Sequence, residues 1–127
     1  MRHRVLAAAV AVVLAVGGPA VAQSGSPDRG ERLFNQQCKN CHTAEKGAGQ
    51  TIGPNLAGLF GRKAGVVEGF NASDAMKASG ITWDETVLAD YLKDPKARVP
   101  GTTMLHAGLK RPEQLADVVA YLRTVAQ

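Results

Sequence analysis

Apolar side chains recur three and four positions apart near the C-terminal end of the chain, which predicts one face of an amphipathic helix. This helix begins near Pro112, and Tyr121 borders its apolar face. A second helix is predicted from Pro27 to about Gln37, because Ser26 can cap it and proline is favoured at the first helical position. The apolar face of the C-terminal helix consists of Leu115, Val118, Val119, Leu122 and Val125.

Gly30 lies inside the predicted N-terminal helix, four positions before Phe34 and on the same face. A glycine in a helix interior costs about 1 kcal/mol relative to alanine, because the unfolded chain gains backbone freedom. We interpret a glycine at this position as a sign that another helix approaches the same face closely.

Residues 82–85, Thr-Trp-Asp-Glu, predict the start of a third helix. Thr82 would cap this helix, and Glu85, three residues later, would complete a capping box. The helix would end at Asp94, because the residue before Pro95 disfavours helical geometry. Its buried side would consist of Val87, Leu88, Tyr91 and Leu92.

A long glycine-rich stretch separates these elements. Residues 43–70 contain seven glycines together with Pro54, and they predict a loop. A loop of this length inside a compact domain is unusual unless it wraps a ligand. A short helix from about Ser73 to Ser79 follows the loop and is stopped by Gly80. With these helices and no alternating strand pattern, we expect an all-α fold.

Residues 1–22 have the three parts of a secretory signal peptide. Arg2 and Arg4 give it a positive start, residues 5–16 are an unbroken run of Val, Leu and Ala, and residues 20–22 form an Ala-Val-Ala cleavage site. The apolar run is shorter than the roughly 20 residues that a membrane-spanning helix needs. We therefore expect an exported protein whose folded domain is residues 23–127, with an uncleaved membrane anchor as the alternative.

Export would change the charge of the working protein. The net charge of the full chain is +4, and it falls to +2 when Arg2 and Arg4 leave with the signal peptide. No basic cluster remains, so nucleic-acid binding loses its main support. A domain of this size buries only about two-thirds of its surface, and its many glycines leave it short of core side chains. We expect a bound group to supply the missing core.

The two cysteines stand in the sequence Cys-Lys-Asn-Cys-His, residues 38–42. This C-x-x-C-H pattern is typical of covalent haem attachment in c-type haem proteins. Two thiols three positions apart can reach the two vinyl groups on one haem edge, and the next residue then lies under the iron. Cys38, Cys41 and His42 are therefore the candidate residues for holding one covalently bound haem c.

Three other interpretations of the motif stay open at this stage. A zinc site needs about four ligands, and the chain offers the motif and the distant His106 but no second C-x-x-C pair. A thioredoxin-like redox pair needs a βαβ context, which the pattern does not predict. A plain disulfide would suit an exported protein with two cysteines. The motif in its context favours haem over all three.

A haem iron bound by one histidine has a second axial position to fill. The candidates are Met76 near the short helix, Met104 in a loop stiffened by Pro100, and His106 two residues further. A lone methionine most often fills space in a core. The residues alone favour Met104 over His106 and leave both open.

Around these residues the chain resembles the class I c-type cytochromes, the family of mitochondrial cytochrome c and bacterial cytochrome c2. The matching stretches run in family order from Gly30 to Tyr121, and they are CKNCHTAEKGAG, GPNLAGLFGRKAG, GITW, YLKDPKARVPGTTM and AYL. The resemblance implies the all-α cytochrome c fold, in which the N- and C-terminal helices cross at Gly30, Phe34 and Tyr121. A helix capped by Thr82 and a short helix would complete the surroundings of the haem.

The resemblance also implies a role for each residue that holds the haem. Cys38 and Cys41 would form the thioethers, and His42 and Met104 would be the axial ligands of the iron. The Pro54 carbonyl would accept the second N–H of His42 and so fix the orientation of its ring.

Four more residues would surround the haem according to the same resemblance. The Tyr91 hydroxyl would lie near the Met104 sulfur, and Trp83 and Arg62 would lie by a buried propionate with Thr102 nearby. A simpler interpretation of Trp83 and Tyr91 is that they are core aromatics, and both can hold, because a buried N–H or O–H still needs a partner.

The function that the resemblance implies is that of a soluble periplasmic one-electron carrier, not an enzyme. Imidazole and thioether would fill both axial positions and leave none for oxygen or a substrate. The expected partners are a quinol-oxidising, bc1-type complex as donor and a terminal oxidase or photosynthetic reaction centre as acceptor, with only peripheral membrane contact. A monomer is expected. A haem peroxidase and a gas-binding module are the alternatives, and each would need an open iron position.

In the resembling family, lysines ring the exposed haem edge and meet acidic patches on partners. Several of these positions hold Gln37, Thr51 and Thr103 here, so electrostatic steering should be weak. An ordinary solvated surface is the alternative. The residues that keep part of the ring are Arg32, Lys39, Lys96, Lys110 and Arg111.

Two departures from the family pattern concern the haem pocket itself. Met76 stands where an asparagine often holds an internal water, which predicts a drier pocket. His106 stands where an aromatic residue, commonly phenylalanine, covers the haem edge. His106 is therefore a candidate for alternative ligation when the Met104 loop loosens.

Overall fold

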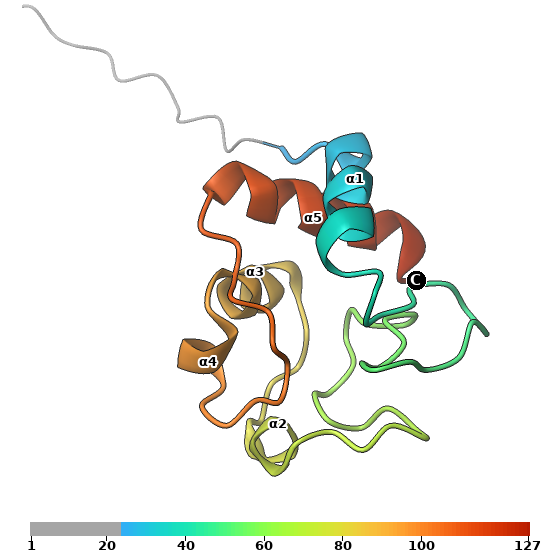
Figure 1. The fold of residues 1–127 in the computed structure, drawn as a ribbon, viewed down its shortest axis with the longest axis vertical. Helices are drawn as coiled ribbons and strands as arrows, with labels where there is room; N and C mark the ends of the chain where they lie inside the picture. The colour runs from blue at the N-terminus through green and yellow to red at the C-terminus, as the bar shows by residue number, and fades with distance from the viewer. Residues whose placement is uncertain (1–23) are drawn as a thin grey trace, which may run out of the picture.

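Helices from the two ends of the domain, α1 and α5, lie across one another on one side of the molecule (Figure 1). The computed structural model describes residues 24–127, so the predicted signal peptide, residues 1–22, lies outside the described range. Within that range the expected all-α fold is confirmed, since the β pairing found there is one isolated bridge between Lys63 and Thr82. The helices are α1 (Pro27–Gln37), α2 (Asp74–Ala78), α3 (Glu85–Lys93), α4 (Pro95–Arg98) and α5 (Pro112–Val125).

The helices α1 and α5 approach as closely as Gly30 predicts. An added Cβ at Gly30 would lie 1.9 Å from the Asp117 carbonyl oxygen and 2.7 Å from the Cβ of Tyr121, so no larger residue fits. The Phe34 and Tyr121 rings pack at the crossing with their centroids 5.4 Å apart. The crossing also anchors the cysteine motif, because Cys38 is the C-cap of α1.

Asp117 is a buried carboxylate in the middle of α5 that the sequence pattern did not single out. Only 5% of this residue is exposed. The Arg29 guanidinium donates two hydrogen bonds to its carboxylate, at 2.7 and 2.8 Å, and the backbone N–H of Ser26 donates a third at 2.7 Å. The bonds from Arg29 are the main reason that the pKa of Asp117 lies below its usual value.

The free energy of unfolding should therefore depend on pH through Asp117. Since the pKa of Asp117 is lower in the folded than in the unfolded chain, its contribution is full above the unfolded pKa and disappears as pH falls through the folded pKa. Asp117→Asn should lower the free energy of unfolding at pH 7 by about 1 kcal/mol and flatten its decline in acid. Thermal unfolding between pH 7 and 3 measures both effects. The exposed Asp90→Asn on α3 is the control, and an equal effect of both substitutions would contradict this role.

The cap of α3 corrects one prediction. The sequence indicated Thr82 as the N-cap, but the helix begins at Glu85 and its N-cap is Asp84, whose carboxylate accepts the N–H of Val87 at 2.8 Å. Thr82 is not the cap because the residue after it is not helical: Trp83 donates its N–H to the Arg62 carbonyl at 2.9 Å and accepts the Gly61 N–H at 2.8 Å, next to the bridge between Thr82 and Lys63. The predicted end of the helix is confirmed, because α3 stops at Lys93.

The remaining segments frame the space beneath the two crossed helices. Residues 43–70 contain neither helix nor strand, as predicted, and the short helix α2 is capped by Ser73, whose hydroxyl accepts the N–H of Met76. The four-residue helix α4 was not predicted, because it is shorter than the repeat that an apolar pattern needs. No helix in residues 24–127 is long and apolar enough to cross a membrane.

Candidate functional site

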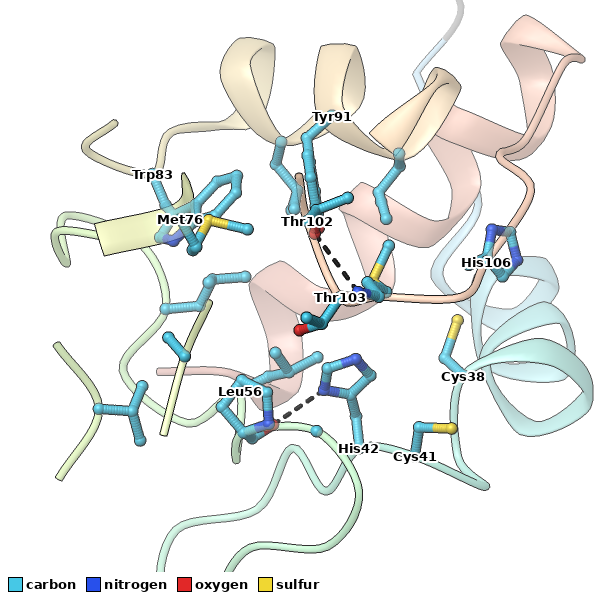
Figure 2. Close-up of a pocket in the computed structure, with 18 of the residues that line it drawn as sticks. Cys38, Cys41, His42, Leu56, Met76, Trp83, Tyr91, Thr102, Thr103 and His106 are labelled. Atoms are coloured by element: carbon cyan, nitrogen blue, oxygen red, sulfur yellow. Dashed lines mark hydrogen bonds between the residues drawn. The ribbon is translucent and has the colours of Figure 1, made fainter. Parts of the chain in front are cut away.

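A largely apolar cavity of about 450 Å³ lies between the cysteine motif, the glycine-rich loop, α3 and the loop before α5 (Figure 2). Its volume lies within the range of typical ligand sites. The cavity is lined by all nine residues that the sequence predicted to hold or surround a bound group. These residues are Cys38, Cys41, His42, Pro54, Arg62, Trp83, Tyr91, Thr102 and Met104.

The His42 ring has a fixed orientation in this cavity. Its Nδ1 lies 2.9 Å from the Pro54 carbonyl oxygen, which can only accept, so Nδ1 carries the proton and Nε2 keeps its lone pair (Figure 2). Burial lowers the pKa of His42 and outweighs the opposing effect of the Pro54 bond. The ring is therefore neutral at ordinary pH, which is the form that binds a metal.

Gly53 packs directly against the His42 ring, a contact that was not predicted. An added Cβ at Gly53 would lie 2.5 Å from Cε1 and 2.8 Å from Nδ1 of His42, so the ring occupies the place of a side chain. The Gly53 N–H also donates to the Cys41 carbonyl at 2.7 Å. A glycine directly before Pro54 was the available signal, although it resembles an ordinary turn.

Cys38 and Cys41 are both free thiols, so the structure does not support a plain disulfide. Burial, with a smaller contribution from Cys41, raises the pKa of the Cys38 thiol to about 11. A thioredoxin-like redox cysteine needs the opposite, a lowered pKa. Among residues 24–127, no three His, Cys, Asp or Glu side chains gather in a metal-binding group. Both thiols line the cavity, where a bound group could reach them.

Across the cavity from His42, hydrogen bonds connect Tyr91, Thr102 and the backbone of Met104. The hydroxyls of Tyr91 and Thr102 lie 2.8 Å apart, and Thr102 also accepts the backbone N–H of Met104 at 3.4 Å. Burial raises the pKa of Tyr91, so its phenol stays neutral. The Trp83 and Tyr91 rings pack with centroids 5.3 Å apart. Tyr91 thus fixes the backbone that carries Met104, through a contact with Thr102 that was not predicted.

Arg62, which also lines the cavity, has an unmet hydrogen-bonding demand. Its two Nη atoms donate to the carbonyls of Ala57 and Asn55, at 2.8 and 3.3 Å. Its Nε is buried without a partner, and within residues 24–127 it is the one side-chain atom in that condition. Burial lowers the pKa of Arg62, but a guanidinium remains charged in proteins. A half-buried cation whose spare N–H is buried fits an acidic substituent on a largely apolar ligand.

The five residues predicted for partner docking are all exposed, and none lines the cavity. Two of them are paired with other groups. Arg111 forms an ion pair with Glu113, and Lys110 lies 3.7 Å from Asp94 while donating to the Lys93 carbonyl. These pairs reduce the positive charge that the surface presents. The other three are Arg32, Lys39 and Lys96.

Two thiols at this spacing, a neutral imidazole directed into an apolar cavity and a half-buried guanidinium fit a haem that is bound covalently and carries propionates. The site therefore defines a c-type haem protein as the class to which the chain belongs.

Comparison with known proteins narrows this class. Residues 27–126 match the sequence model of the family described as cytochrome c. A cytochrome c from Chlamydomonas reinhardtii is 50% identical over 104 residues, which is 82% of this chain and 93% of the relative. A cytochrome c2 from Blastochloris viridis is 48% identical over 119 residues, which is 94% of this chain and 86% of the relative. The chain belongs to the cytochrome c family. Its members bind haem c covalently and are electron carriers rather than enzymes, as the resemblance implied.

Proposed function

We propose that this protein is a soluble periplasmic one-electron carrier in which Cys38 and Cys41 form thioethers to haem c, and His42 and Met104 are the axial ligands of its iron. One observation carries the ligand assignment. The Pro54 carbonyl fixes the proton on Nδ1 of His42, which leaves Nε2 as a ligand inside a cavity that Met104 also lines.

Bound haem c supplies a one-electron Fe(III)/Fe(II) couple. His42 and Met104 would occupy both axial positions and so exclude oxygen, peroxide and substrates from the iron. A thioether ligand raises the reduction potential relative to a second imidazole. The Tyr91–Thr102 pair holds the backbone of Met104, and Pro54 holds His42, so both ligands would keep their places when the charge of the iron changes.

Arg62 and Trp83 would surround a haem propionate. The unpartnered Nε of Arg62 supports this assignment, because a carboxylate would satisfy it in a largely apolar cavity. The guanidinium would then compensate the propionate charge, which is costly to bury alone.

The proposed periplasmic location rests on the signal peptide. The match to the cytochrome c2 from Blastochloris viridis spans 119 residues, more than residues 23–127 contain, so it reaches back into the predicted signal. The match to the algal cytochrome c spans 104 residues. An alignment that reaches into residues 1–22 supports export, and cleavage after Ala22 would release the domain of residues 23–127.

The electron-carrier assignment with both axial positions filled predicts a clear spectroscopic result. The purified holoprotein should be low-spin, show the weak Met–iron charge-transfer band when ferric, and leave carbon monoxide unbound when reduced at neutral pH. Absorption spectra before and after carbon monoxide addition measure this. Rapid carbon monoxide binding would favour a peroxidase or a gas-binding module instead.

We further propose that the donor is a quinol-oxidising, bc1-type complex and the acceptor a terminal oxidase or a photosynthetic reaction centre, each with an acidic docking patch. The docking residues would be Arg32, Lys39, Lys96, Lys110 and Arg111. Their exposure supports this, and the ion pairs of Lys110 and Arg111 indicate only weak steering.

Weak steering has a measurable consequence. Raising the ionic strength from about 0.01 to 0.15 M shortens the screening length from about 30 to 8 Å, so the rate of oxidation by such a partner should fall modestly. Lys39→Gln should reduce both the rate and its salt dependence, whereas Lys77→Gln on α2, outside the proposed surface, should change neither. Rates that do not respond to salt would contradict the docking surface.

A further inference from the structure

His106 lines the cavity, two residues after Met104 in the same loop. Figure 2 shows its ring on the side of the pocket where Cys38 lies. Imidazole is a common ligand of iron. A competing ligand therefore shares the loop with Met104, and an interaction in the protein has to keep it away from the iron.

Both nitrogens of the His106 ring are engaged. The backbone N–H of Gly108 donates to Nδ1 at 2.9 Å, so Nδ1 is the unprotonated nitrogen. Nε2 therefore carries the proton and donates to the Gln37 side-chain oxygen, also at 2.9 Å. In this tautomer Nε2 has no lone pair for a metal, and the lone pair of Nδ1 is directed at Gly108.

The two partners of His106 sit on well-fixed parts of the fold. Gln37 is the last residue of α1, which packs on α5. Gly108 has a φ of +100°, and a Cβ there would lie 2.3 Å from the Lys93 carbonyl oxygen at the end of α3. The next N–H, that of Leu109, donates to the Leu92 carbonyl at 2.8 Å. We call the hydrogen bonds of His106 to Gln37 and Gly108 the lock. This lock joins the loop of His106 to both α1 and α3.

We propose that Gln37 and Gly108 hold the His106 ring off the haem iron and so determine that Met104 is the axial ligand. This proposal rests on the His42/Met104 ligation proposed above. Gln37 is a positioning residue that acts through His106. Losing one hydrogen bond of ordinary strength raises the fraction of molecules in which the His106 ring is released by about two- to tenfold. Because a second imidazole gives a lower reduction potential than a thioether, capture of the iron by His106 would lower the potential.

The test uses Gln37→Leu, which removes the acceptor and nearly keeps the side-chain size. In the ferric holoprotein, the fraction ligated by His106 should rise by about two- to tenfold. Electron paramagnetic resonance should show a bis-imidazole signal, the Met–iron band should weaken, and the midpoint potential should fall. The double variant Gln37→Leu/His106→Phe should recover the wild-type band and potential. Gln36→Leu, at the exposed neighbouring position of α1, is the matched control and should behave as wild type.

Two results would overturn the lock while leaving the proposed function intact. One is a Gln37→Leu protein with the wild-type spectrum and potential. The other is a double variant that keeps the altered spectrum, since the effect of Gln37 would then not run through His106. A wild-type protein without the Met–iron band would instead refute the His42/Met104 pair, and the lock with it. The wild-type spectrum thus separates the two failures.

Discussion

Without its haem, the chain should be unfolded. The double variant Cys38→Ala/Cys41→Ala, purified free of haem, should show little helical circular dichroism and no cooperative transition in urea. The physical reason is the cavity of about 450 Å³. At about 24 cal/mol per Å³, leaving such a cavity empty costs on the order of 10 kcal/mol, which is comparable with the entire free energy of unfolding of a small domain.

The same variant provides its own control. Adding haem without covalent attachment should restore part of the helical signal, because filling the cavity and binding His42 do not need the thiols. Recovery would show that the lost cavity contents, rather than the two alanines, cause the unfolding. A cooperative, native-like transition in the haem-free protein would contradict the role of haem as the missing core.

Met104→Ala should open the sixth position of the iron. The reduced variant should bind carbon monoxide rapidly, and its reduction potential should fall by a substantial part of the roughly 0.8 V range that axial ligands control. Spectroelectrochemistry and carbon monoxide titration measure the two effects. Met76→Ala is the matched control, since Met76 lines the same cavity. It should keep the Met–iron band, and an unchanged potential in Met104→Ala would exclude Met104 as the ligand.

Much of the fold could be predicted from local sequence signals. Ser26-Pro27 marked the start of α1, the apolar repeat marked α5, and Gly30 marked their close crossing. The error at Thr82 has a simple cause. Its capping signal is local, whereas the backbone bonds of Trp83 to Gly61 and Arg62, which delay the start of the helix, join it to the glycine-rich loop. A local pattern does not contain those contacts.

For the candidate site too, local signals predicted some features and long-range contacts determined others. The lining of the cavity could be predicted because a short motif and a family resemblance carry it. The contact of His42 with Pro54 was predicted by the resemblance, whereas two contacts that join segments far apart in the chain were missed. Asp117 bonds Arg29 across 88 positions, and His106 bonds Gln37 across 69. Nothing in the sequence near Asp117 or His106 indicates these partners, so only the folded chain shows what each residue contacts.

The crossing of α1 and α5 has a consequence for the order of events during biosynthesis. A ribosome finishes α5 last, and an exported chain delivers it last across the membrane. Until then α1 lacks the surface against which Gly30 and Phe34 pack. The motif at residues 38–42 follows α1 directly and so remains in an open polypeptide during this interval. Its thiols are then accessible to whatever machinery attaches the haem. Because the haem-free chain is expected to stay unfolded, α5 closes the domain only around the attached haem, and that closure ends the access.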